Sequence, residues 1–309
     1  MGYKSLAESV LLAPAKDGAD RLCILTKSAA PNMVSWLLLN HIRQLKMPVK
    51  VELMLDAAAG VEVSAHKSYR ELHAVVPYFV CSYIYEPETV GTNLYIWLRN
   101  VSPAVAYAGT AVFEQGDFLA KVNGSLTLCD AAGAWAQFQS AVGSSIYCHH
   151  SEVEEHVVIC QVPAGANGST GNHNEEVTLS LVTNRTGEPG VHSGLNWGQR
   201  KGRNPNQAYI PLPIKVAKSG FFPVEPVDAP PHFSVVTDDK RQLILRIEQQ
   251  NQKAIATPLS NALLGEYFRN RLGLANGAYV TRADLERYGR IDVKFVKIDD
   301  EHYYMDFSV

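Results

Sequence analysis

The stretch that carries most information is Ser193-Gly-Leu-Asn-Trp-Gly-Gln-Arg-Lys-Gly-Arg-Asn-Pro-Asn-Gln-Ala-Tyr-Ile-Pro211. It concentrates Arg, Asn and Gln, whose paired donors and acceptors match base edges in the DNA major groove. Glycines at positions 194, 198 and 202 allow backbone to approach a ligand closely, and basic side chains nearby can hold phosphates. By composition alone, the stretch could equally be a polar loop that is only solvated and binds nothing. Trp197 and Tyr209 favour a contact or packing role, so the stretch predicts a DNA-contacting loop.

The charge of the chain is concentrated in one segment. A formal net charge of −3 over 309 residues argues against nucleic-acid binding by bulk electrostatics alone. Residues 1–156 hold 11 Lys/Arg against 15 Asp/Glu, whereas residues 157–309 hold 17 against 16. Within residues 185–218 there are six basic residues and one acidic residue, Glu188. A local basic surface around the quoted stretch is therefore compatible with the small total.

Residues 161–175 are rich in Gly, Asn, Ser and Thr and have almost nothing to bury, which predicts a linker. It separates residues 1–160 from residues 176–309, and each part is close to ordinary domain size. In the first part, strand-like runs alternate with a helical pattern over Asn32–Lys46, with Asn32 as its expected cap, which predicts an α/β domain. The expected strands there are 22–25, 49–55, 75–85, 94–98 and 104–108.

Residues 176–309 are dominated by runs of β-branched residues, which predict an antiparallel barrel or sandwich. Two helices are expected to interrupt it, over residues 259–272 and 281–288. The second opens with Thr281-x-x-Asp284, a capping-box pattern that satisfies free backbone amides. The expected strands are 177–182, 208–212, 232–236, 243–247 and 291–298.

No membrane or secretory pattern is present. The first 19 residues lack a signal h-region, and no apolar stretch approaches the roughly 18 residues of a spanning helix. Five scattered cysteines without an export signal predict reduced thiols and a cytoplasmic location.

Two clusters have residue types suited to metal binding or catalysis. Cys148-His149-His150, with His156 and Cys160, has zinc-type ligands but no standard spacing, which favours a chance cluster. His66-Lys67 lie side by side in a helical context, which predicts surface residues without a catalytic role. We therefore expect no metal and no cofactor.

The quoted stretch, taken as Ser193–Arg200 followed by Asn206–Pro211, closely resembles the restriction-endonuclease family typified by NgoFVII. The resemblance covers nearly the whole chain, with further matches at Thr257–Asn261, Leu264–Arg269, Asp284–Arg290 and Tyr303–Ser308. It implies a mainly-β carboxy-terminal pseudobarrel, like the plant "B-three" transcription-factor domain, that grips duplex DNA in the major groove with two arms.

By this resemblance residues 193–209 form or adjoin one arm, and residues 253–261 the other. Arg269 and Arg271, on a predicted helix, suit a solvated face better than DNA contact. Trp197 and Tyr209 are expected to pack the base of the arm as well. The side chains predicted to contact DNA are Asn196, Trp197, Gln199, Arg200, Arg203, Asn204, Gln207, Lys253, Thr257 and Asn261.

The same resemblance implies a phospholipase-D-like α/β domain at the amino terminus. In that family a His-x-Lys pair, doubled across a homodimer, attacks the phosphodiester without metal, and a downstream Asn helps to neutralise the phosphate. The matching frame here is Val90–Trp97 and Gly109–Val112. Gly91 stands at the position of the nucleophilic His, Asn93 at the Lys and Val112 at the Asn. The flanking residues of the motif are kept, but the three side chains that would carry out the reaction are absent.

These features predict a sequence-specific duplex DNA-binding protein of restriction-endonuclease ancestry that is catalytically inactive by itself. It would act in a restriction or phage-defence complex, as a homodimer through the first domain or with a nuclease or ATPase subunit. The main alternative is an active endonuclease that uses a non-standard site or a partner's His-x-Lys. A weaker alternative is a binding module for a non-DNA ligand.

Overall fold

The computed structural model describes residues 5–45, 47–85, 90–119, 124–160, 175–226, 229–248 and 252–309. The chain divides into two compact units, residues 1–167 and 168–309. The linker expected over residues 161–175 lies, apart from Glu175, outside the described residues.

The first unit is built on a seven-stranded mixed sheet of order β7-β6-β5-β1-β2-β4-β8. Its parallel centre consists of β1 (Arg21–Thr26), β2 (Lys50–Asp56) and β4 (Phe79–Ile84). Antiparallel strands flank this centre: β5 (Asn93–Arg99), β6 (Ser102–Gly109), β7 (Leu126–Cys129) and β8 (Ser145–Tyr147). A separate parallel pair joins β3 (Val61–Glu62) to β9 (Ile159–Cys160). The predicted α/β class is confirmed.

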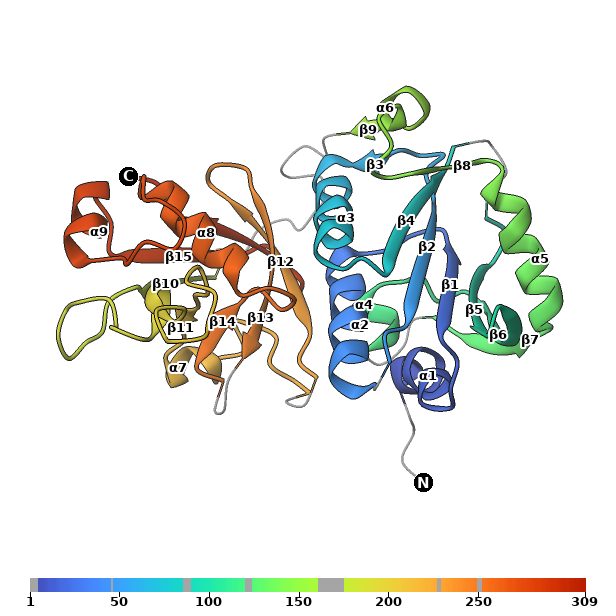
Figure 1. The fold of residues 1–309 in the computed structure, drawn as a ribbon, viewed down its shortest axis with the longest axis horizontal. Coiled ribbons are helices and arrows are strands. Elements are labelled where there is room, and N and C mark those ends of the chain that lie inside the picture. Colours follow the sequence, from blue (N-terminus) through green and yellow to red (C-terminus); the bar gives the residue numbers. More distant parts are fainter. Residues whose placement is uncertain are drawn as a thin grey trace. The chain divides into compact units, whose positions relative to one another are not determined.

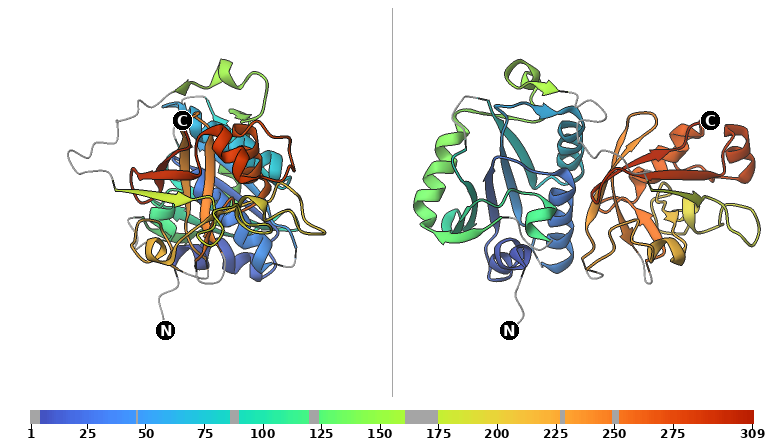
Figure 2. Two further views of the ribbon diagram at one scale, coloured as in Figure 1. Left: turned by 90° about the vertical axis from the view of Figure 1, so that its left-hand side faces the viewer. Right: turned by 180° about the vertical axis from the view of Figure 1, so that it is seen from behind.

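Helices cover both faces of this sheet, which is why most residues of its central strands are buried. Helices α2 (Pro31–Gln44) and α3 (Val63–Val75) lie on one face and α5 (Ala131–Val142) on the other (Figures 1 and 2). Shorter helical segments are η1 (Ala7–Leu12), α1 (Ala13–Lys16), α4 (Gln115–Phe118) and α6 (Val153–His156).

Two local predictions in the first unit were wrong. Helix α2 begins after Ala30, with Pro31 in its first turn, and Asn32 does not cap it. The Asn32 side chain lies inside the helix and accepts a hydrogen bond from Met33 N. The strand expected from residue 75 starts at Phe79, because Val75 ends α3.

The second unit is a seven-stranded sheet of order β10-β15-β16-β12-β13-β14-β11, in which only β12 and β16 pair in parallel among the described strands. Its edge strands β10 and β11 contact each other, so the sheet nearly closes into the predicted pseudobarrel. Strands β14 and β16 were not predicted. The strands are β10 (Glu176–Ser180), β11 (Ile210–Pro211), β12 (His232–Thr237), β13 (Gln242–Glu248), β14 (Ala254–Ala256), β15 (Asp292–Lys297) and β16 (His302–Asp306).

Helices α8 (Ala262–Arg271) and α9 (Arg282–Tyr288) are the longer helices of this unit. Helix α8 starts three residues later than expected, and the capping box of Thr281 and Asp284 on α9 is confirmed. Two short helical turns, η2 (Gly194–Asn196) and α7 (Ile214–Ala217), lie before and after β11. None of the described helices of either unit is long and apolar enough to cross a bilayer.

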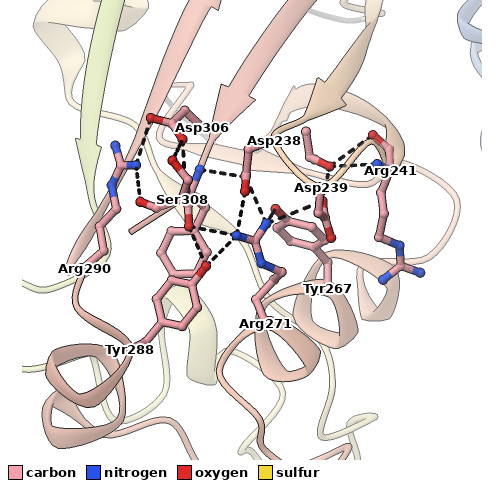
Figure 3. A network of polar contacts seen from close by, with 11 residues as sticks. Asp238, Asp239, Arg241, Tyr267, Arg271, Tyr288, Arg290, Asp306 and Ser308 are labelled. Carbon is pink, nitrogen blue, oxygen red and sulfur yellow. Dashed lines mark hydrogen bonds and ion pairs between the residues drawn. The ribbon is translucent and has the colours of Figure 1, made fainter.

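A polar network joins α8, α9 and the end of β16 (Figure 3). Arg271, at the end of α8, donates to both carboxylate oxygens of Asp238, at 2.9 and 2.6 Å, and to Phe307 O at 3.0 Å. Tyr288 on α9 also donates to Phe307 O, at 2.6 Å, and Arg290 contacts Asp306 at 3.0 Å. The network therefore ties the last strand to both helices and to the turn after β12.

This network predicts a loss of stability in acid. Burial opposes ionisation of Asp306, but hydrogen bonds from Ser308 and Arg290 outweigh it and lower its pKa to about 2. For Asp238, burial also opposes ionisation, yet the hydrogen bonds from Arg271 outweigh it, so its pKa is lowered as well. A carboxyl whose pKa is lower in the folded state stabilises the fold above its unfolded pKa of about 3.9, and this contribution is lost as pH falls through the folded pKa.

We therefore expect the free energy of unfolding to fall between about pH 4 and about pH 2, with about 1–2 kcal/mol lost from Asp306. Urea unfolding across this range measures the slope. Asp306→Asn should flatten it relative to the unchanged chain, and an unaltered slope in that variant would contradict the assignment.

Candidate nucleic-acid interface

Residues 193–209 form a compact loop that closes on itself, which we call the arm loop. Gly198 N donates to Gln207 O at 2.7 Å, and Gln207 N donates to Asn204 O at 3.0 Å. Gly198 is required by this closure, because a Cβ at that position would lie 2.2 Å from Asn204 O. The expected close approach of this glycine is thus to the protein's own backbone rather than to a ligand. The loop is consequently held in one shape before any ligand binds.

Two arginines lie over one tryptophan on the exposed side of the arm loop. The guanidinium carbon of Arg200 is 4.1 Å from the centre of the Trp197 ring, and that of Arg203 is 4.5 Å from it. The ring in turn meets Tyr209 edge-on, with centroids 5.5 Å apart. Among the described residues no carboxylate pairs with either arginine. Cation–π contact with one ring therefore holds two uncompensated positive charges close together, and this arrangement suits an anionic ligand.

The remaining predicted residues of the arm loop divide by exposure. Asn204 is exposed, and half-buried Gln207 accepts a hydrogen bond from Arg203 at 3.2 Å. Lys201, which the predicted contacts did not include, is exposed in the same loop. Its positive charge within the basic segment was the signal that could have identified it.

Asn196 is a correction to the predicted contact residues. Its side chain is fully buried, with Nδ2 donating to Val280 O at 2.8 Å and Oδ1 accepting from Val280 N at 2.9 Å. Gln199 also uses its amide inside the protein, donating to Gly277 O at 2.9 Å and to Pro205 O at 3.2 Å. Both side chains fasten the arm loop to the segment before α9, so Asn196 is removed from the proposed contacts.

The second predicted arm, residues 253–261, contributes fewer free side chains than expected. Lys253 is exposed, whereas Thr257 is buried and donates to Ser260 O at 2.6 Å. Half-buried Asn261 precedes α8, and its carbonyl accepts from Ala208 N at 3.0 Å. Thr257 therefore has a structural role, and Lys253 is the accessible cation of this segment.

Arg269 and Arg271 do not form the solvated face that their helical position suggested. Arg269 is fully buried and donates to three backbone carbonyls, those of Ala278, Gly265 and Leu195. Burial lowers the pKa of its guanidinium. Both arginines are built into the fold, so neither is a candidate for DNA contact.

The three altered positions of the first unit lie at one end of its sheet, around the start of β5 and the end of β6. Gly91 is exposed, and a Cβ there would meet no atom within 4 Å in the described part of the chain. Asn93 is buried, and its Nδ2 donates to Thr110 O at 3.0 Å and to Gly109 O at 3.3 Å. Half-buried Val112 donates its backbone N–H to the Asp117 carboxylate at 2.8 Å. A carboxylate beside the third position disfavours a bound phosphate.

Asn93 has a structural hydrogen-bonding role at the position where the resemblance leads us to expect a lysine. Its Oδ1 also accepts from Lys27 N at 2.9 Å and from Thr26 Oγ at 3.1 Å, so each end of the amide has two partners. Replacement by alanine removes the side-chain partner of Lys27 N, Gly109 O and Thr110 O and of the buried Thr26 hydroxyl. We expect Asn93→Ala to lower the free energy of unfolding by about 1–3 kcal/mol, and Asn93→Lys to be no less harmful.

Urea unfolding of the full chain measures this effect. Thr92→Ala, at the exposed neighbouring position, is the control and should change stability by less than about 0.5 kcal/mol. If Asn93→Ala were as stable as the unchanged chain, the hydrogen-bonding role of Asn93 would be contradicted.

His66, in one of the two other clusters of catalytic residue types, does not lie where it was expected. His66 is buried rather than on the surface, and its Nδ1 lies 3.1 Å from the Tyr83 hydroxyl, whereas Lys67 is exposed. His149 stacks on His73, with ring centroids 4.3 Å apart. In the described part of the chain no group of three or more His, Cys, Asp or Glu side chains is arranged to hold a metal ion.

Comparison with known proteins gives two family matches. Residues 4–155 match the model of the NgoFVII restriction endonuclease N-terminal PLD domain. Residues 169–299 match that of the NgoFVII C-terminal B3-like DNA-binding domain. No curated protein matches the sequence.

Proposed function

Because the chain belongs to the NgoFVII restriction-endonuclease family, with a PLD domain followed by a B3-like DNA-binding domain, we propose that it binds duplex DNA sequence-specifically without cutting it. The observation that carries this proposal is the paired guanidinium cluster of Arg200 and Arg203 on Trp197. Exposed cations without acidic partners attract phosphates, and arginine also pairs with guanine edges. The proposed contacts are Trp197, Arg200, Arg203, Asn204, Gln207 and Lys253, with Gln199 and Asn261 at the margin.

The residues at the altered positions of the first unit support the proposal that the chain does not hydrolyse DNA. A glycine has no group that can attack phosphorus, and a valine side chain cannot neutralise phosphate charge. Asn93 uses its whole amide within the protein, and Asp117 adds negative charge beside Val112. The unit would then serve as a dimerisation or partner-binding domain, in a cytoplasmic restriction or phage-defence complex whose cutting subunit is another chain.

The test uses the purified full chain with diverse plasmid and phage DNA, with and without EDTA or added divalent metals. We expect retarded duplexes in a gel shift and intact DNA under every condition. Selection of bound sequences from random duplexes, with modified cytosines included, would identify the site. Sequence-specific double-strand cleavage by this chain alone would overturn the proposal.

A second candidate function is an endonuclease completed by a partner chain. The space at Gly91 favours it, because a Cβ built there would meet no atom of the described residues within 4 Å, which leaves room for a partner's group at the nucleophile position. Mixing the chain with a family member that retains His-x-Lys is the test. Cleavage at the selected site by the mixture, and by neither chain alone, would establish this function instead.

A further inference from the structure

The connection between α8 and α9 is fastened to the arm loop. We call its residues 275–280 the interhelix segment. Arg269 donates to Ala278 O at 2.7 Å, and the Asn196 amide pairs with both backbone groups of Val280. The two side chains come from different elements, since Arg269 lies on α8 and Asn196 in the arm loop.

Further contacts join the arm loop to the tip of the interhelix segment. Gln199 donates to Gly277 O at 2.9 Å, and Gly277 N donates to Asn206 Oδ1 at 2.6 Å. Gly277 has a φ of 79°, and a Cβ there would lie 3.0 Å from Pro205 Cγ. The turn also carries its own hydrogen bond, from Ala278 N to Ala275 O at 3.0 Å. The segment and the arm loop are therefore one continuous, rigid surface element.

Two side chains of this segment are exposed while its backbone is fixed. Asn276 is exposed, and Tyr279 has 42% of its surface accessible. Among the described residues neither side chain makes a hydrogen bond. The buried anchors Asn196 and Arg269 hold their backbone in place, so ligand binding there would need little ordering of the backbone.

We propose that the interhelix segment is a second DNA-contact element, in which the Asn276 amide and the Tyr279 hydroxyl donate hydrogen bonds to the DNA backbone. The proposal rests on the proposed function, because its ligand is the duplex that the arm loop binds. Both groups are neutral donors, and such groups commonly bind phosphate oxygens and fix the register of a protein on DNA. The proposed roles thus differ: arginines of the arm loop supply charge and base contact, and the interhelix segment supplies position.

The experiment measures equilibrium binding of the full-length protein to the duplex selected above and to an unrelated duplex of equal length. We expect Tyr279→Ala and Asn276→Ala each to weaken binding by about tenfold, on both duplexes alike, because backbone contacts carry no sequence information. Thermal unfolding of both variants should match the unchanged chain, since both side chains are exposed. The matched control is Tyr147→Ala, which removes an exposed tyrosine (52% accessible) of the first unit and should leave affinity within about twofold.

Each result has a distinct meaning. Unchanged affinity of both variants, with the unchanged chain binding DNA, would overturn the contact element alone. A loss confined to the selected duplex would overturn the backbone assignment. Failure of the unchanged chain to bind any duplex would overturn the proposed function itself.

Discussion

Arg271→Ala is expected to destabilise the second unit by about 3–5 kcal/mol, the largest single effect on stability that we predict. The Arg271 and Asp238 side chains are only 16% and 12% exposed, so their ion pair is largely removed from water. Removing the arginine leaves the Asp238 carboxylate without its paired cation and with neutral backbone donors such as Phe307 N. It also takes a donor from Phe307 O and from the Tyr288 hydroxyl. The loss exceeds the ordinary worth of one ion pair because a buried charge becomes uncompensated.

Hydrogen–deuterium exchange of the full chain, followed by mass spectrometry, can locate this effect. We expect faster exchange in peptides from β12, α8 and β16, and little change in the first unit. Arg287→Ala is the control: its side chain is 61% exposed and pairs with Asp284 on the same helix, so its removal should cost less than about 1 kcal/mol. Arg271→Lys should recover only part of the stability, because an ammonium cannot form the two-pronged contact with Asp238. Wild-type protection in Arg271→Ala would show that the network does not stabilise the unit.

The double variant Arg200→Ala/Arg203→Ala should produce the largest loss of DNA affinity, about 100-fold or more at moderate salt. Each base or phosphate contact of an arginine is worth about 1–3 kcal/mol, and both groups share one ring. Arg200→Ala alone should lose discrimination between sites if Arg200 pairs with a base. If the Arg200 side chain contacts only phosphate, Arg200→Ala should instead reduce the salt dependence of binding.

Lys215→Ala/Lys218→Ala provides a charge-matched control. It removes two exposed cations at α7 in the same unit, and Lys215 and Lys218 are not among the proposed contacts. Fluorescence anisotropy over a salt series would compare the two double variants. If both weaken binding equally, bulk charge rather than the arm loop determines affinity, and the assignment of the cluster fails.

Local patterns predicted the fold class and several of its elements. The Thr281 and Asp284 capping box and the β-branched runs of β12, β13 and β15 involve neighbours in sequence, so residue type and spacing suffice to identify them. Strand β14 has only three residues, and β16 was missed although it is a central strand. Its position between β12 and β15 depends on pairing with distant segments, which periodicity does not reveal.

The sequence did not show which polar side chains of the arm loop are buried and which are exposed. Asn196 and Asn204 have the same chemistry in the same loop, yet one is buried against Val280, 84 residues away, and the other is exposed. An amide matches an adenine edge and a peptide group equally well, so residue type cannot tell these partners apart. Likewise Arg269 binds three carbonyls inside the unit, while Arg200 remains exposed over Trp197.

The sequence by itself indicated the family and the order of its two domains, which the family matches confirm. It also has Gly91, Asn93 and Val112 at the positions where the resemblance expects the reacting residues. These are properties of residue identity and spacing. Only the tertiary structure decided which polar groups are already satisfied within the protein and which are left for a ligand. That division depends on contacts between residues far apart in the chain, and a buried polar group must find its partner there.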